Sequence, residues 1–236
     1  MNNPIFYTDP DGNCPPGVNC MDPLPNISIV SSGSSGKKGG TFGYTRSGGN
    51  QFHSGIDLRA SRGTSLQAPL GGKVIYAKNN HSSNEYSGKR RPGVSKYPTT
   101  GYGNAAVLEY TIESNFDIEG KNGTVSLEKG QKVFIRFTHM DNVDESLVGQ
   151  DVSIGSELGE TGATGNPGSH NGQWGISKEN RHTHMEVSTS MSKDGALSKS
   201  GMIDARVFIK SQVDNNGNVT PASPPPVDDK LKGNQN

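Results

Sequence analysis

The chain has 236 residues, of which only 29% are hydrophobic, and its mean hydropathy is −0.68. Its 23 basic and 23 acidic residues cancel, so no net positive charge attracts it to a nucleic acid or to an anionic membrane surface. No stretch approaches the roughly 20 apolar residues of a membrane-spanning helix. These properties predict one domain with polar extensions, without a nucleic-acid partner and without insertion into a membrane.

Residues 1–40 are predicted to form a flexible N-terminal linker, because they are rich in Pro, Asn, Gly and Ser and include the run SSGSSGKKGG. The first residues, MNNPIFYTDPDGNC, lack the basic and apolar regions of a signal peptide. Three explanations stay open: a signal was removed, export follows a specialised route, or the protein stays in the cytoplasm.

The two cysteines, Cys14 and Cys20, lie in this segment within CPPGVNC. Their spacing does not match the close pairs of a structural zinc site. We therefore expect a local disulfide. The alternative is that one thiolate reaches a metal ion and silences an enzyme.

Residues 41–212 carry the predicted domain. Short apolar runs with strand composition occupy residues 73–77, 105–110, 132–137 and 184–187, and each is bounded by Gly, Asn or Pro. No long stretch has helical periodicity, and 32 glycines favour many turns. We predict a mainly β fold built as an antiparallel sheet. Residues 213–236 are polar and proline-rich and are predicted to be a disordered tail.

Potential metal ligands occur first in the motif HSGID at residues 53–57. On a straight strand the backbones of His53 and Asp57 would be ~13 Å apart, too far to share one ion through bonds of about 2 Å. The backbone must therefore bend for both to bind one metal, and Gly55 is placed to allow a bend. The alternative is that Asp57 begins a turn and His53 is an exposed loop residue.

Two further histidine clusters follow. His139 stands at the end of the apolar run 132–137, where a lone histidine is usually structural. In HTH, His182 and His184 are two residues apart and project from the same face of a strand, with Thr183 on the other. One of them can bind a metal while its neighbour contacts substrate or water; the alternative is a half-buried strand with incidental histidines.

Together these clusters resemble the lysostaphin-like zinc metallopeptidases, whose pattern is an HxxxD near the start, a lone His after a middle strand and a closing HxH. Other segments are similar to further motifs of that family in the same order. They are FGYTR at 42–46, LQAPLGGKVIYA at 66–77, GYGNAAVLEY at 101–110, FTHM around His139 and VGQDVSIGSELGETGATG at 148–165.

The resemblance implies one zinc ion per chain, bound by His53, Asp57 and His184, with His139 and His182 in catalytic roles. It also implies a substrate groove walled by long loops and hydrolysis of peptide bonds in bacterial peptidoglycan, in a stem peptide or a cross-bridge. Two alternatives stay open: a non-catalytic domain that binds the wall or regulates hydrolases, and a wall-clearing component of a phage or secretion apparatus.

Several expectations about context accompany this function. The protein would act in the periplasm, in the cell wall or outside the cell, on the peptides of peptidoglycan. A delivered toxin or effector would fit the missing signal peptide, and an immunity or regulatory protein would then be a partner. A monomer is expected.

Two enlarged connections depart from the family pattern and are predicted to be surface loops. Residues 79–102 include His81 and the basic run Lys89, Arg90 and Arg91, and could form a groove wall. Residues 166–181 interrupt the usual short connection to HxH and hold His170 and Trp174. Both side chains could touch substrate, although a loop packed on itself is the simpler expectation.

Overall fold

The computed structural model describes residues 14–31, 37–79, 102–165 and 181–222. In chain order its strands are β1 (Gly43–Arg46), β2 (Gln51–His53), β3 (Gly55–Arg59), β4 (Ser65–Gln67), β5 (Gly72–Lys78), β6 (Asn104–Thr111), β7 (Phe116–Gly120), β8 (Gly123–Leu127), β9 (Lys132–Val143), β10 (Asp151–Val152), β11 (Glu157–Thr161), β12 (His182–Ser188), β13 (Met202–Ile203), β14 (Gln212–Val213) and β15 (Val219–Thr220). Short 3-10 helices lie between them: η1 (Ser47–Gly49), η2 (Glu145–Leu147), η4 (Lys199–Gly201) and η5 (Ala205–Phe208).

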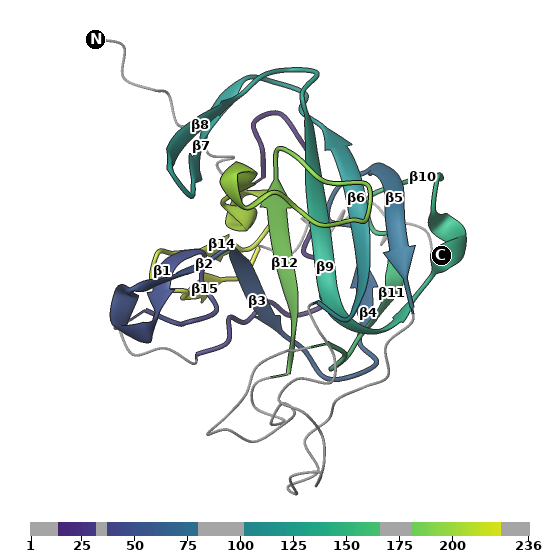
Figure 1. The fold of residues 1–236 in the computed structure, drawn as a ribbon, viewed down its shortest axis with the longest axis horizontal. Coiled ribbons are helices and arrows are strands. Elements are labelled where there is room, and N and C mark those ends of the chain that lie inside the picture. Colours follow the sequence, from purple (N-terminus) through teal and green to yellow (C-terminus); the bar gives the residue numbers. More distant parts are fainter. Residues whose placement is uncertain (1–13, 32–36, 80–101, 166–180, 223–236) are drawn as a thin grey trace, which may run out of the picture.

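The predicted mainly β, antiparallel fold is confirmed. One large sheet has the strand order β10-β5-β6-β9-β12-β13-β7-β8, with β3 paired to β12 and β11 paired to β4 and β9 (Figure 1). All of these pairs are antiparallel. The four predicted apolar runs fall within β5, β6, β9 and β12. Strands β1 and β2 form a separate hairpin, as do β14 and β15.

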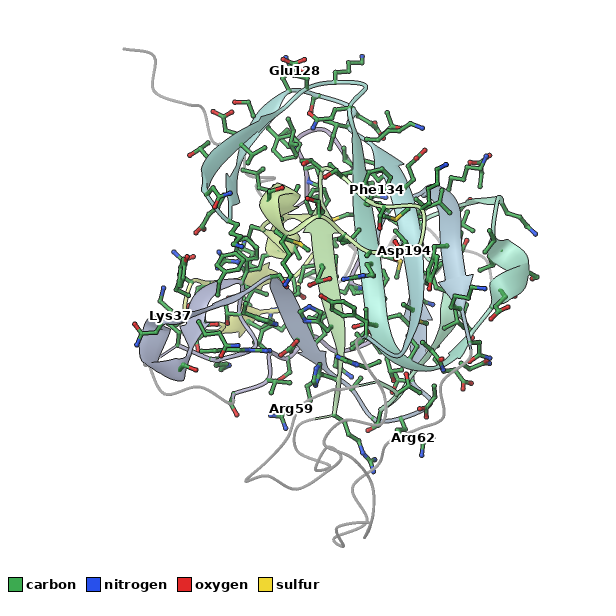
Figure 2. All side chains as sticks on the ribbon, in the orientation of Figure 1. Lys37, Arg59, Arg62, Glu128, Phe134 and Asp194 are labelled. Atoms are coloured by element: carbon green, nitrogen blue, oxygen red, sulfur yellow. A yellow bond between two sulfur atoms is a disulfide. The ribbon has the colours of Figure 1, made fainter. Side chains whose placement is uncertain are left out.

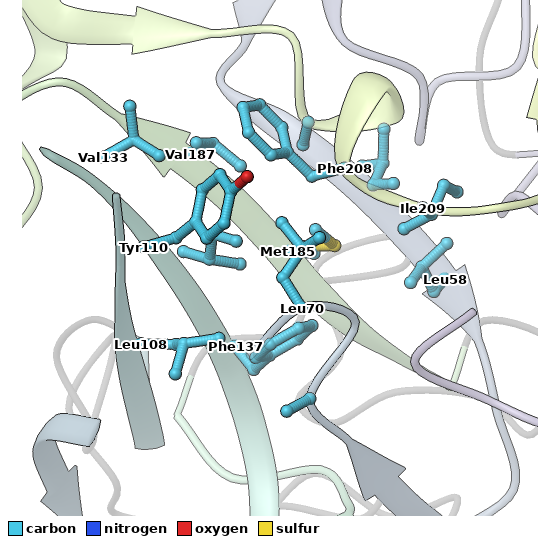
Figure 3. Close-up of a cluster of buried hydrophobic side chains, with 14 of the residues drawn as sticks. Leu58, Leu70, Leu108, Tyr110, Val133, Phe137, Met185, Val187, Phe208 and Ile209 are labelled. Carbon is cyan, nitrogen blue, oxygen red and sulfur yellow. The ribbon is translucent and has the colours of Figure 1, made fainter. Parts of the chain in front are cut away.

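The hydrophobic core lies on one face of the central strands. Alternate residues of β9, namely Val133, Ile135 and Phe137, are fully buried, as a strand with one face on a core requires. Figure 3 shows Phe137 and Val133 in one cluster with Tyr110 of β6 and Phe208 of η5. The short helix η5 therefore covers the core face of the sheet.

Polar side chains occupy the opposite face of the same strands. The strand register places His184 of β12 beside Thr138 of β9, and Glu186 beside Arg136. All four are buried. Because side chains alternate along a strand, all four project away from the hydrophobic core. The sheet thus gathers these four buried polar groups on one face.

Residues 14–31, which we call the N-terminal strap, belong to the folded domain, so the predicted flexible linker is wrong for them. Leu24, Ile29 and Val30 are buried. Ile29 forms a β-bridge with Leu58 of β3, which covers the edge of β3 that β12 leaves unpaired. The average composition of this segment is polar, so it does not reveal the few apolar residues that pack against distant strands. The burial of those few residues is enough to hold the segment on the domain.

Within the strap, Cys14 and Cys20 form a disulfide and are both buried in the core. The expected local disulfide is confirmed. Both sulfur atoms are used in this bond, so the alternative of an inhibitory thiolate on a metal is wrong for this state of the chain.

The folded region also extends beyond the predicted boundary at residue 212. Strands β14 and β15 form a hairpin whose turn is held by Asp214, which accepts hydrogen bonds from the backbone of Asn216 and Asn218. Asp and Asn favour this kind of turn because their side chains bond to nearby backbone N–H groups. The polar composition of 213–220 therefore encodes a turn and not disorder.

Several predictions concern residues outside the described ranges. These are the flexibility of residues 1–13 and 32–36, the tail 223–236, and the two enlarged connections with His81, Lys89, Arg90, Arg91, His170 and Trp174. The groove that the connections would wall stays a prediction. Among the described residues, no helix has the length and apolar character needed to cross a membrane.

Candidate metal centre

His53 and Asp57 come together because the chain changes sheets between them. His53 ends β2 and pairs with Gly43 of β1, whereas Asp57 lies in β3 and pairs with His184 of β12. The result is a separation of 3.2 Å between His53 Nε2 and Asp57 Oδ1. The backbone therefore bends between the two residues, as the binding of one metal ion by both would require. Both residues are buried, so the alternative that His53 is an exposed loop residue is wrong.

Gly55 has a different role from the predicted one. Its backbone is not in the left-handed region that would single out glycine at a bend. Instead, a Cβ at this position would lie 2.1 Å from the Met185 carbonyl oxygen of the neighbouring strand. Glycine is therefore needed because the backbones of β3 and β12 approach too closely for a side chain.

His184 completes a group of three potential ligands. Its Nδ1 lies 2.7 Å from Asp57 Oδ1 and 3.1 Å from His53 Nε2. The three residues each offer one ligand atom, and these atoms all lie within 4.8 Å of one another. The structure thus brings together the three residues that the family resemblance implies as metal ligands.

His139 and His182 stand beside this group. The ring centroids of His139 and His182 are 5.2 Å apart, and His182 Nε2 lies 3.6 Å from Asp57 Oδ1. His139 has a φ of 62°, in the left-handed region that non-glycine residues seldom adopt. Strained backbone of this kind recurs at functional sites, where the surrounding structure holds it in place.

Backbone carbonyl groups set the proton positions on two of the histidines. Nδ1 of His53 lies 3.0 Å from the Thr41 carbonyl oxygen, and Nδ1 of His139 lies 2.9 Å from that of Thr164. A carbonyl oxygen can only accept, so each Nδ1 carries the hydrogen and donates it. The Nε2 lone pair of each ring therefore remains available to the site.

Arg46 holds the Asp57 carboxylate and was not among the predicted site residues. Its guanidinium donates to Asp57 Oδ2 at 2.6 Å and to the Gly39 carbonyl at 3.1 Å. Burial opposes the ionisation of Asp57, but neighbouring His53 and the other histidines outweigh it and hold the pKa of this carboxyl well below its usual range. The motif FGYTR, which contains Arg46, was the signal for this residue.

A second arginine–carboxylate pair supports His184. Glu186 Oε1 lies 3.0 Å from His184 Nε2 and also accepts a hydrogen bond from Ser54. Its other oxygen accepts from Nε of Arg136 at 3.1 Å and from a second guanidinium nitrogen. Glu186 and Arg136 are both buried. Sequence reasoning missed this pair, although Glu186 is two residues from His184 and so projects from the same strand face.

These contacts shift the pKa values of the buried groups in opposite directions. Burial alone would lower the pKa of His184, but the carboxylates of Glu186 and Asp57 outweigh it and raise this pKa to about 9. Burial, with His182 and His184 nearby, lowers the pKa of His139 to about 3. His139 is therefore a neutral imidazole at pH 7, able to accept a proton at Nε2.

Tyr102 lies beside the group and contacts two of the buried side chains. Its ring lies over the Arg136 guanidinium, with 3.7 Å from the guanidinium carbon to the ring centroid. It also stacks on His184 with 6.4 Å between centroids. Tyr102 is 37% exposed, so one part of the ring supports the buried groups and another part faces solvent.

Comparisons with known proteins give structural neighbours only. No protein-family profile matches the chain. No curated protein matches it either. The structural neighbours are M23 peptidases and lysostaphin-type domains, at 14–21% identity.

Three of these neighbours illustrate the extent of the likeness. A candidate M23 peptidase from Pseudomonas aeruginosa is 21% identical with a TM-score of 0.41; the match covers 83% of this chain and 52%, about half, of that protein. The catalytic domain of lysostaphin from Staphylococcus simulans is 20% identical with a TM-score of 0.36, and 67% and 84% of the two chains are covered. A catalytic-domain mutant of the prophage-encoded M23 protein EnpA from Enterococcus faecalis is 19% identical with a TM-score of 0.38, and 76% and 95% are covered. These values are too low to transfer an activity to this chain.

Proposed function

We propose that this protein is a zinc-dependent endopeptidase that hydrolyses peptide bonds of bacterial peptidoglycan. The observation that carries the proposal is the convergence of His53, Asp57 and His184, whose ligand atoms lie within 4.8 Å of one another. Two imidazoles and one carboxylate are a donor set of catalytic zinc sites, which keep a fourth position open.

The geometry of the three residues fits one zinc ion. Zinc bonds of 2.0–2.1 Å in a tetrahedral arrangement separate two ligand atoms by about 3.3 Å. The three atom pairs here are 2.7, 3.1 and 3.2 Å apart. Hydrogen bonds from Nδ1 of His53 and from Nε2 of His184 would orient these two rings, as outer partners of zinc-binding histidines usually do.

We assign the proton transfers to the remaining two histidines. A zinc ion bound here would supply Lewis-acid chemistry, polarising the peptide carbonyl and lowering the pKa of a water. His139 would accept the proton of the attacking water at Nε2, because its Nδ1 is already used and the ring is neutral. His182, 5.2 Å away between ring centroids, would steady the developing oxyanion or protonate the departing amine.

Peptidoglycan as the substrate rests on the motif resemblance. This substrate implies action in the periplasm, in the cell wall or outside the cell. We also propose that the protein is a monomer. A delivered effector with an immunity partner, or a wall-clearing part of a phage or secretion apparatus, would use the same chemistry. A non-catalytic wall-binding domain is less favoured, because the three ligand residues, both further histidines and their buried hydrogen-bond partners are all retained.

Zinc content and peptidoglycan digestion test this function together. Mass spectrometry should find one zinc per wild-type chain and loss of the metal in His184→Ala, since catalytic zinc uses three protein ligands. Digestion of purified peptidoglycan, with products identified by mass, should give new peptide termini with wild type alone. Bound zinc without cleavage would support the binding or regulatory alternative, and a wild-type chain that takes up no zinc in metal-replete medium would end the proposal.

A further inference from the structure

A surface pocket lies at the end of β3, the strand that also carries Asp57. Its volume is about 350 Å³, within the range of sites that bind small ligands or parts of a peptide. The N-terminal strap contributes Leu24, Asn26 and Ser28 to its wall, and the chain after Asp57 contributes Arg59, Ser61 and Thr64.

Arg59 connects this pocket to the site. It is two residues beyond Asp57 on β3, so both side chains project from the same face of the strand. It also pairs directly with His182 of β12, and opposed residues of an antiparallel pair have Cβ atoms about 5 Å apart. Figure 2 shows Arg59 at the end of β3 beside the beginning of β12.

Arg59 has no counterion among the described residues. Arg46, Arg62, Arg136 and Arg206 each form an ion pair with a carboxylate. The described contacts of Arg59 are its backbone hydrogen bond to Ser28 and its strand pairing, and no Asp or Glu lines the pocket. Arg59 is half-buried and lines the pocket, and its guanidinium is suited to an anion because its planar donors match the geometry of a carboxylate.

The other residues that line the pocket indicate which chemical groups a ligand would carry beside the anion. Ser28, Ser61 and Asn26 provide further hydrogen-bond donors, and Leu24 provides an apolar surface for a small side chain. Along an extended peptide each residue spans about 3.3 Å, so a carboxylate two or three residues from a bond held at His182 would reach this pocket.

We propose that this pocket binds a free carboxylate of the peptide substrate through Arg59. The inference rests on the proposed function and gives it a substrate class. The protein would act on a stem peptide that bears a carboxylate near the cleaved bond, and not on an uncharged glycine cross-bridge.

Binding of two matched peptides tests the pocket without requiring turnover. The probes are acetyl-L-Lys-D-Ala-D-Ala, which ends in a carboxylate, and the same peptide with a terminal carboxamide. Calorimetry on the full-length wild type should give a dissociation constant about 10 to 100 times lower for the carboxylate, as expected for a charge-assisted hydrogen bond. Arg59→Gln should bind both peptides equally, and Arg59→Lys should keep part of the preference.

Arg62→Gln is the matched control. It removes the same charge three residues away, and Arg62 is ion-paired with Asp141 and is not part of the pocket. It should keep the wild-type preference. Equal affinity of wild type for the two peptides, no binding of either up to millimolar concentration, or a preference that survives Arg59→Gln would each overturn the inference. Peptidoglycan cleavage in the digestion assay would continue in those cases, so the two proposals fail separately.

Discussion

Two buried arginine–carboxylate pairs in this molecule differ in what lies beyond the ion pair. Arg206 binds Asp204 through two guanidinium nitrogens, and its other donors reach the Val213 carbonyl and Asn215. These partners all lie within residues 204–215, and a longer ion pair of 3.6 Å joins the guanidinium to Glu119 of β7. The pair therefore holds the β14–β15 hairpin against the domain, and bidentate geometry makes this attachment specific.

In the second pair, Arg136 and Glu186 each contact a further side chain of the candidate site. Glu186 accepts from His184, a proposed metal ligand, and Arg136 supports the Tyr102 ring, which stacks on His184. The two pairs have nearly the same internal chemistry. The two pairs differ in the residues that they contact: one contacts a hairpin and the other a proposed metal ligand. Matched substitutions in both pairs can therefore distinguish an effect on folding stability from an effect on metal binding.

Removal of either arginine should produce the largest loss of unfolding free energy among these substitutions. Arg136→Met and Arg206→Met each leave a buried carboxylate without its partner, which costs about 3–5 kcal/mol of unfolding free energy. Urea denaturation of the metal-free proteins measures this loss. Only Arg136→Met should also weaken zinc binding in competition with a chromophoric chelator. Weakening of the same size in Arg206→Met would show that lower stability alone explains it.

The stability of the metal-free protein should fall as the pH rises from 7 to 10. The folded-state pKa of His184 is about 9, above its ordinary value of 6.5, so protonated His184 stabilises the fold below pH 6.5 and this contribution disappears as the pH passes 9. The difference corresponds to roughly 3 kcal/mol. Denaturation midpoints across this pH range measure it. His184→Gln should flatten the profile, and an unchanged slope in that variant would assign the effect to other groups.

Glu186→Gln should weaken zinc binding by about 10- to 100-fold, the usual effect of losing a hydrogen-bond partner of a metal-binding histidine. The cobalt-substituted protein should show a changed visible spectrum, because the His184 ring is no longer held by an anion. Asp204→Asn makes the same chemical change in the second pair and should leave both measurements at wild-type values. A wild-type zinc affinity in Glu186→Gln would remove Glu186 from the site.

The three proposed metal ligands were predicted through the family resemblance, whereas the residues that support them were not predicted. The motifs HxxxD and HxH place the candidate ligands within a few positions of one another, and the family resemblance implied that His53, Asp57 and His184 are the three that bind the metal. Arg136 and Glu186 meet through the pairing of β9 with β12, fifty residues apart. A single sequence does not reveal such a register, and Arg136 looks like one polar residue in an apolar strand.

Contacts between residues far apart in the sequence also explain two of the differences from the sequence predictions, namely the anchored strap and the role of Gly55. Ile29 is buried only because β3 leaves one edge open to the strap, and Gly55 is required by the approach of Met185 from β12. Local composition and spacing carried neither fact. The strand runs, by contrast, were predictable because alternation and turn residues act within a few positions.

Tyr102 offers the smallest and most selective test of the comparison, since in the described structure a cation–π contact is made by Arg136 and none by Arg206. Tyr102→Leu should cost about 0.5–2 kcal/mol of unfolding free energy through loss of this contact. A double-mutant cycle with Arg136→Met isolates the contact, because the effect of Tyr102→Leu should shrink when the guanidinium is absent. The same substitution combined with Arg206→Met should be additive. Equal coupling in both cycles would mean that Tyr102 acts on the fold as a whole, and that its ring does not belong to the network of His184.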